Sequence, residues 1–336
     1  MSRKSFFALV VMVLAIGLIS APLVSLAQSE DSEEELDIAV VVKISGIPWF
    51  NRMKEGVKQA AEDFDVNAFQ QGPSTADAAA QVSVVEDLIA RGVDAICVVP
   101  NNAKSLVPAF NKARDAGITV LTHESPFFTE AQEYDIETIN NTEYGKMAID
   151  QIAKRTEGEV GYVQFVGSLT VPLHNYWADT AVEYAKEEYP RMKELTERLP
   201  VAESQEDSYR SALDLIRKYG PELDAIIGWG SLGPPGAAQA VREKGLSDEI
   251  IVGGSSLPSQ AAAYLADGSM DWLQLWDPKD AGYAMVYVAR QLARGEELEE
   301  GMEIPGMGEI TVEDKVISVN QMVFMEEAEK AEEAGF

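Results

Sequence analysis

The sequence has a single cysteine and two histidines, and this shortage excludes several kinds of site. Cys97 has no partner for a disulfide framework, and no thiol lies near the N-terminal segment where a lipid could be attached. His123 and His174 are distant in the sequence, and neither has a cysteine or histidine at metal-ligand spacing. We therefore expect no metal, no cofactor and no lipid anchor.

Basic residues are also scarce. The chain has 27 lysines and arginines against 56 aspartates and glutamates, which gives a formal net charge of −29. Because this charge repels phosphate backbones, we expect no nucleic acid as a partner. We interpret the excess of carboxylates as a solvated surface suited to salt or heat, rather than as a cation-binding function.

Common catalytic signatures are missing as well. The chain contains no GxxxxGK[ST], GxSxG or HExxH pattern. The glycine-rich segment from Gly228 to Ser231 carries a serine, but without a nucleophile elbow it is better explained as a strand-to-helix turn. We therefore expect a binding protein and not an enzyme.

The N-terminal residues indicate export. Arg3 and Lys4 precede an apolar run, and the small residues at 25–27 fit a signal-peptidase site. We expect a cleaved signal peptide over 1–27, a flexible acidic tether over 28–35 and a periplasmic location. An uncleaved membrane anchor is the alternative, because the apolar stretch from 6 to 27 is nearly long enough to span a membrane.

From Leu36 onward, short apolar strands alternate with amphipathic helices, a pattern typical of parallel sheets with helices on both faces. The strands are expected at 38–42, 67–70, 95–99, 119–122, 160–166, 225–228 and 250–254. Asp94-Ala95-Ile96 and Asp224-Ala225-Ile226 begin matching strands in two similar halves. The sequence therefore predicts an α/β protein of two similar doubly wound lobes with a ligand cleft between them.

Polar and aromatic residues cluster where the expected strands end. Sugar hydroxyls need charged or amide partners, whereas the apolar faces of a sugar ring favour tryptophan or phenylalanine. The candidate ligand-binding residues are Lys43, Trp49, Phe50, Asn101, Glu124, Asn140, His174, Trp177, Trp229, Ser231, Gln260 and Asp277.

Several of these candidates have a purely structural explanation too. Lys43 can form a structural ion pair, and Trp49 and Phe50 can fix a helix start against the core. His174 and Trp177 are three residues apart at a helix start, which also fits packing. Asp277 can cap the helix that follows it.

The chain resembles the type I periplasmic binding proteins, in the branch of the autoinducer-2 and rhamnose-type sugar receptors. The resemblance runs from about 36 to 336, and its carriers are the segments 43–50, 71–75, 121–125, 170–171 with Trp177, 275–277 and 305–308. It implies that Lys43 contacts ligand and that Glu124 replaces an aspartate of the autoinducer-2 receptor. Leu173-His174 stands where that receptor has an Asp-Gln pair, and Trp229 and Ser231 stand where it has proline and alanine.

The resemblance further implies two discontinuous lobes joined by three crossings and a hinge. We expect 36–138 with 276–302 in the N-terminal lobe, and 139–275 with 303–336 in the C-terminal lobe. The expected protein is a monomer that delivers a monosaccharide or sugar-like polyol to the permease of an ABC importer.

Three alternatives stay open. The ligand can be autoinducer-2, although the loss of a carboxylate and the gain of an aromatic surface favour a sugar ring. The closed protein can signal to a sensor instead of, or besides, a permease. An enzyme would use Glu124 and Asp277 as an acid–base pair.

Overall fold

The computed structural model describes residues 35–127, 131–156 and 159–336. The predicted signal peptide, 1–27, and residues 28–34 of the predicted tether lie outside these ranges. Within the described ranges, no helix combines the length and the apolar character needed to cross a membrane.

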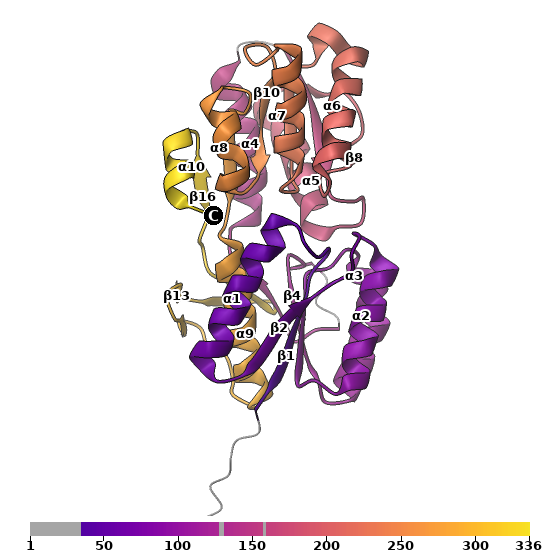
Figure 1. The fold of residues 1–336 in the computed structure, drawn as a ribbon, viewed down its shortest axis with the longest axis vertical. Helices are drawn as coiled ribbons and strands as arrows, with labels where there is room; N and C mark the ends of the chain where they lie inside the picture. The colour runs from indigo at the N-terminus through magenta and orange to yellow at the C-terminus, as the bar shows by residue number, and fades with distance from the viewer. Residues whose placement is uncertain (1–34, 128–130, 157–158) are drawn as a thin grey trace, which may run out of the picture. The chain divides into compact units, whose positions relative to one another are not determined.

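The first sheet has seven strands in the order β14-β15-β5-β4-β3-β1-β2, and each neighbouring pair is parallel except β14 with β15. Its helices lie on both faces, α1 and α9 on one and α2 and α3 on the other (Figure 1). The strands are β1 (Asp37–Val41), β2 (Asn67–Gln71), β3 (Ala95–Val98), β4 (Thr119–His123), β5 (Tyr134–Glu137), β14 (Thr311–Glu313) and β15 (Val316–Ser318). The helices are α1 (Pro48–Phe64), α2 (Ala78–Arg91), α3 (Ala103–Asp115) and α9 (Pro278–Ala293).

The two faces of this sheet follow from the side-chain alternation of β1. Ile38 and Val40 belong to the core cluster that includes α1 and α9, whereas Ala39 and Val41 belong to the cluster that includes α2 and α3. A strand buried on both faces reads as a continuous apolar run, which is why 38–42 was recognisable in the sequence.

Cys97 lies in the middle of this core. Its side chain is fully buried in β3, and its Sγ atom lies 3.6 Å from the carbonyl oxygen of Met285 in α9. Burial raises the pKa of the thiol, so the sulfur stays protonated and behaves as a small apolar group.

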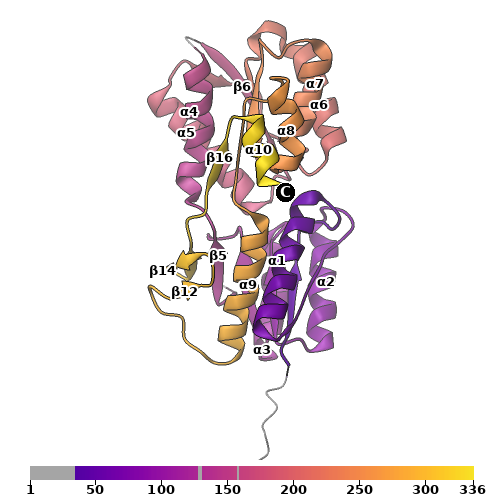
Figure 2. The same cartoon turned by 60° about the vertical axis from the view of Figure 1, so that its left-hand side comes forward.

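The second sheet has the order β16-β11-β10-β9-β6-β7, and β8 also pairs with β6. Figure 2 shows α4 and α5 on one side of it and α6, α7 and α8 on the other. The strands are β6 (Val160–Val166), β7 (Met192–Glu194), β8 (Leu199–Pro200), β9 (Ala225–Gly228), β10 (Ile251–Ser255), β11 (Trp272–Leu275) and β16 (Val323–Met325). The helices are α4 (Asn141–Arg155), α5 (Pro172–Glu188), α6 (Gln205–Tyr219), α7 (Gly233–Lys244), α8 (Pro258–Ala266) and α10 (Ala328–Ala334). The predicted α/β fold of two doubly wound sheets is confirmed.

The chain passes between the two sheets three times within the described ranges. These connections run from β5 to α4, from β11 to α9, which packs on the first sheet, and from β15 to β16. A separate two-stranded hairpin, β12 (Glu303–Ile304) with β13 (Gly308–Glu309), precedes the last connection. The topology therefore has the three crossings that the sequence resemblance implied.

The strand pairing differs from the expected lobe boundaries in one segment. Residues 303–336 were expected in the C-terminal lobe, but β14 and β15 belong to the first sheet, where β15 pairs with β5 (Figure 2). The hairpin between them turns at Asp314 and Lys315, both with positive φ, at 47° and 66°. Strands of three residues joined by a turn that lacks glycine give no recognisable sequence pattern. The return of the chain to the first sheet was therefore not predicted. The other boundaries stay a prediction.

Candidate functional site

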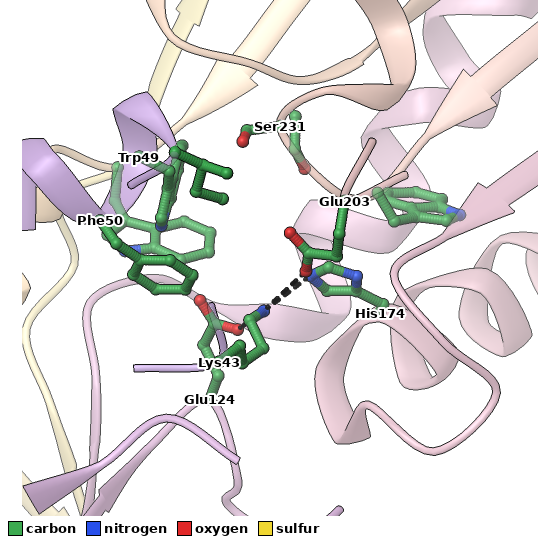
Figure 3. A pocket seen from close by; sticks show the side chains of 11 residues that line it. Lys43, Trp49, Phe50, Glu124, His174, Glu203 and Ser231 are labelled. Atoms are coloured by element: carbon green, nitrogen blue, oxygen red, sulfur yellow. Dashed lines mark hydrogen bonds and ion pairs between the residues drawn. The ribbon is translucent and has the colours of Figure 1, made fainter. Parts of the chain in front are cut away.

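A small cavity lies where loops from the two sheets meet (Figure 3). Its volume is about 20 Å³, which is room for about one water molecule. The lining residues are Lys43, Ile47, Trp49, Phe50, Glu124, His174, Glu203, Trp229, Ser231, Ser255 and Trp276.

The position of this cavity follows from the topology. Lys43 and Glu124 follow β1 and β4 of the first sheet, and Glu203 follows β8 of the second. His174 lies in the first turn of α5, which comes after β6. Because the carboxyl ends of parallel strands meet at one edge of a sheet, residues distant in the sequence converge here.

Lys43 is the charged centre of the cavity. Its Nζ atom lies 2.8 Å from Glu124 Oε2, 3.2 Å from His174 Nε2 and 3.6 Å from Glu203 Oε1. Burial lowers the pKa of Lys43, but the attraction of Glu124 and Glu203 outweighs it, so the pKa of Lys43 ends above its usual range. The lysine is therefore held as a cation in a buried site.

Glu124 is held in a backbone conformation that few residues adopt. Its φ angle is 61°, in the left-handed region, which costs a non-glycine residue roughly 1 kcal/mol. The side chain is only 3% exposed and meets Lys43 directly. Backbone strain at this position thus serves to direct a carboxylate at the lysine.

His174 and Glu203 stand on the opposite wall (Figure 3). Burial, together with the nearby charge of Lys43, holds the pKa of His174 well below its usual range, so its imidazole is neutral. Burial raises the pKa of Glu203, and the attraction of Lys43 opposes this rise only in part.

Aromatic rings form the apolar part of the walls. Trp49 and Trp276 meet edge to face with ring centroids 5.1 Å apart, and Lys43 Nζ lies 5.8 Å from the centroid of the Phe50 ring. The indole N–H of Trp229 donates to Gln164 Oε1 at 2.8 Å, which fixes that ring at the far side. The cavity thus combines buried charges with flat apolar surfaces.

Seven of the twelve residues predicted from the sequence line this cavity. They are Lys43, Trp49, Phe50, Glu124, His174, Trp229 and Ser231. Their contact with a ligand stays a prediction.

The other five candidates lie outside the lining, and all of them except Gln260 have structural roles of their own. Asn101 donates from Nδ2 to the carbonyl of Lys43 at 2.8 Å, so it supports the lysine loop. Asn140 caps α4 through Glu143 N, at 3.1 Å. The ring of Trp177 is buried and stacks on His174, with centroids 5.6 Å apart. Asn101 and Trp177 therefore support lining residues of the cavity, and Asn140 supports the start of α4.

Asp277 and Gln260 are the remaining two. Asp277 caps α9 by accepting from Lys279 N and forms a two-pronged ion pair with Arg52 of α1, at 2.9 and 2.6 Å. The capping explanation of Asp277 is therefore confirmed. Gln260 lies in α8, and its Oε1 atom has no hydrogen-bond partner among the described residues.

Sequence reasoning missed Glu203 entirely. This residue follows β8, a strand of only two residues that shows no apolar run, so the loop after it was not recognised as a strand end. Ile47, Ser255 and Trp276 were not selected either, although Ile47 and Trp276 lie in segments that carry the family resemblance. A carboxylate shortly after a strand end is the pattern that would have selected Glu203.

The turn between β9 and α7 has the glycine spacing of dinucleotide-binding turns, with Gly228, Gly230 and Gly233. Here the close approaches are to the protein itself. A Cβ atom on Gly228 would lie 2.4 Å from Pro234 Cδ, and one on Gly230 would lie 2.8 Å from the carbonyl oxygen of Ala202. The next strand, β10, ends in serine instead of the carboxylate that binds a ribose. These glycines are packing residues.

Comparison with known proteins agrees with this geometry. Residues 38–297 match the family model described as the periplasmic binding protein domain. The chain belongs to the periplasmic binding protein family. Members of this family bind solutes and are not enzymes, which confirms the expectation that the site is not catalytic.

Individual relatives of this periplasmic binding protein are distant. The chain is 23% identical to the ribose import binding protein RbsB of Escherichia coli over 286 residues, 84% of this chain and 93% of that protein. The structure of LsrB from Clostridium saccharobutylicum in complex with AI-2 has a TM-score of 0.84 at 23% identity and covers 90% of this chain and 100% of that one. A Clostridium phytofermentas solute-binding protein with bound L-rhamnose has a TM-score of 0.82 at 22% identity and covers 89% and 98%. Both structural comparisons confirm the fold.

Proposed function

We propose that this protein captures a monosaccharide or similar polyol in the cavity and delivers it to an ABC importer. The observation that carries the proposal is the buried set of Lys43, Glu124, Glu203 and His174 enclosed by aromatic rings. Charged partners satisfy hydroxyl groups and flat rings cover the C–H faces of a sugar. RbsB is a ribose import protein, and one similar structure holds L-rhamnose.

Binding on this proposal requires movement. A cavity of about 20 Å³ is smaller than any monosaccharide, and Lys43 reaches across it to His174. The walls must therefore separate to admit the ligand, and the three connections between the sheets are the natural hinge.

Thermal unfolding with a sugar panel tests the proposal. The panel contains D-ribose, L-rhamnose, D-arabinose, D-galactose, D-galacturonate and D-galactosamine. A ligand at about 100 times its Kd stabilises the folded state by about 2.7 kcal/mol, which raises Tm by several degrees. We expect at least one sugar to do so, and Lys43→Met to abolish the shift while Lys58→Met, on the exposed face of α1, keeps it. If no member of the panel raises Tm, the ligand class is wrong.

Autoinducer-2 is the second candidate, because LsrB with AI-2 is among the similar structures. Leu173-His174 stands where the resemblance expects an Asp-Gln pair, and Trp229 stands where it expects a proline. The loss of a carboxylate and the gain of an aromatic surface favour a sugar ring over autoinducer-2. AI-2 belongs in the same thermal panel, and a larger Tm shift with AI-2 than with every sugar would select it.

Export and delivery complete the proposal. We infer that 1–27 directs the chain to the periplasm, and N-terminal sequencing of the exported protein tests whether cleavage follows residue 27. Deleting the partner permease distinguishes transport from signalling, because uptake of the ligand ends only if the protein serves an importer.

A further inference from the structure

The two histidines differ in the hydrogen-bonding role of Nδ1. The backbone N–H of Gly167 donates to Nδ1 of His174 at 3.0 Å, so that nitrogen carries no hydrogen. A neutral imidazole has one N–H, which therefore sits on Nε2. His123 is arranged the other way, since its Nδ1 lies 2.6 Å from the carbonyl oxygen of Ile136 and must donate.

This tautomer creates a conflict inside the cavity. The Nε2–H of His174 faces Nζ of Lys43 at 3.2 Å, and an ammonium group can only donate. The two groups are thus a pair of donors that cannot satisfy each other. Glu203 Oε1 lies 3.6 Å from the same Nζ and finds no hydrogen-bond donor in the part of the chain that the structure describes.

We propose that one hydroxyl oxygen of the bound sugar accepts hydrogen bonds from Lys43 Nζ and His174 Nε2 together, while the same hydroxyl donates to Glu203 Oε1. This inference rests on the proposed sugar-binding function and narrows its ligand class to neutral polyols. A hydroxyl is the small group that can accept twice and donate once, and it satisfies all three side chains.

The charges around this position exclude the nearest alternatives. A sugar acid would place its carboxylate beside Glu124 and Glu203, with only Lys43 in compensation. An amino sugar that placed its ammonium here would gain the attraction of the second carboxylate, but it would add a second cation and a third donor where Lys43 and His174 already face each other. Neutral hydroxyls avoid both penalties.

A second oxygen position lies on the same walls. The indole N–H of Trp276 and the hydroxyl of Ser231 line the cavity, and neither has a partner within the described ranges. The indole can only donate and the serine can do both. A ligand with several hydroxyls can satisfy both sets, whereas a compound with one hydroxyl cannot.

Nuclear magnetic resonance of the imidazole nitrogens tests the tautomer without any ligand. The chain has only two histidines, so the spectrum of the ¹⁵N-histidine-labelled protein is simple, and His174→Gln assigns the signals. We expect His174 to be neutral with its hydrogen on Nε2 at pH 7.5. A hydrogen on Nδ1, or a protonated ring, overturns the inference whether or not a sugar binds.

Two substitutions then test the bridging oxygen with the panel sugar that raises Tm most. The longer Gln side chain can place an N–H near the Nε2 position, whereas the shorter Asn side chain reaches only the Nδ1 position, where its oxygen can accept from the Gly167 amide. We expect His174→Asn to weaken binding of that sugar about 10-fold or more, and His174→Gln to retain more affinity than His174→Asn. Equal loss in both variants overturns the donor role.

The panel itself separates the two proposals. If D-galacturonate or D-galactosamine raises Tm more than every neutral sugar, this inference fails while sugar binding stands. If no sugar binds, the proposed function fails, and the nitrogen spectrum still decides whether Lys43 and His174 are a pair of donors.

Discussion

At the scale of single residues, the site depends on charged side chains that are already buried without a ligand. Lys43 is 2% exposed and has two carboxylates within 4 Å, a placement that would be costly without those partners. The sequence indicated Lys43 and Glu124 because each follows a recognisable strand. Glu203 could not be predicted, since its proximity to Lys43 is created only when the second sheet forms. The residues next to Glu203 in the sequence do not indicate this contact.

Gly167 provides a test at this scale. A Cβ atom on it would lie 2.6 Å from Glu203 Oε1 and 3.1 Å from His174 Nδ1, so only glycine leaves room for both side chains. We expect Gly167→Ala to displace them, to lower the free energy of unfolding by about 1–3 kcal/mol and to abolish the sugar-dependent rise in Tm. Urea unfolding and the thermal panel measure the two effects. Leu169→Ala, at an exposed side chain in the same loop, is the control and should change neither.

At the scale of elements, long buried strands were predictable and short edge strands were not. Expected strands at 95–99 and 160–166 agree with β3 and β6 to within a residue, because their apolar runs need no partner to be recognised. Strands such as β8 and β15 form only by pairing with neighbouring strands, and they are too short to show an apolar pattern in the sequence.

β5 carries a buried acid pair beside the first connection between the sheets. Asp135 and Glu137 point to the same face of the strand, and neither Asp135 Oδ2 nor Glu137 Oε1 has a partner among the described donors. Burial raises the pKa of both carboxyls, and the neighbouring Asp135 raises that of Glu137 further, so we expect the pair to hold one proton between its two free oxygens. At neutral pH the folded protein therefore keeps a proton that the unfolded chain has already released.

The stability that this pair contributes is fully present below the ordinary carboxyl pKa and is lost as the pH rises through the raised values. Glu137→Gln replaces the shared proton with a permanent amide N–H. We expect its Tm to exceed that of the wild type by a margin that grows from pH 5 to pH 8, as scanning calorimetry would show. Glu143→Gln, at an exposed carboxylate of α4, should show no growing margin. A margin independent of pH for Glu137→Gln would contradict the shared proton.

At the scale of the whole molecule, most of the net charge lies away from the proposed binding cavity. The formal net charge of −29 belongs mostly to exposed carboxylates, whereas the cavity is enclosed and carries its own compensating lysine. Like-charge repulsion on the surface is screened by salt, but buried pairs are screened much less.

We therefore expect Tm to rise by several degrees when NaCl is raised from about 10 mM to about 0.5 M. The affinity for the best sugar of the panel should stay within about twofold over the same range, because its partners are buried. Scanning calorimetry at each salt concentration measures Tm, and calorimetric titration at the same concentrations measures the affinity. A steep loss of affinity with salt would place the ligand at an exposed, charged surface instead.

The buried thiol of Cys97 has a practical consequence for measuring this binding. With its sulfur enclosed in the core and protonated, the wild-type chain should resist maleimide reagents while it is folded. A cysteine introduced at Leu169, which is 61% exposed, would then be the single point of attachment for an environment-sensitive dye. The native sequence is thus already a suitable background for a fluorescent sugar sensor.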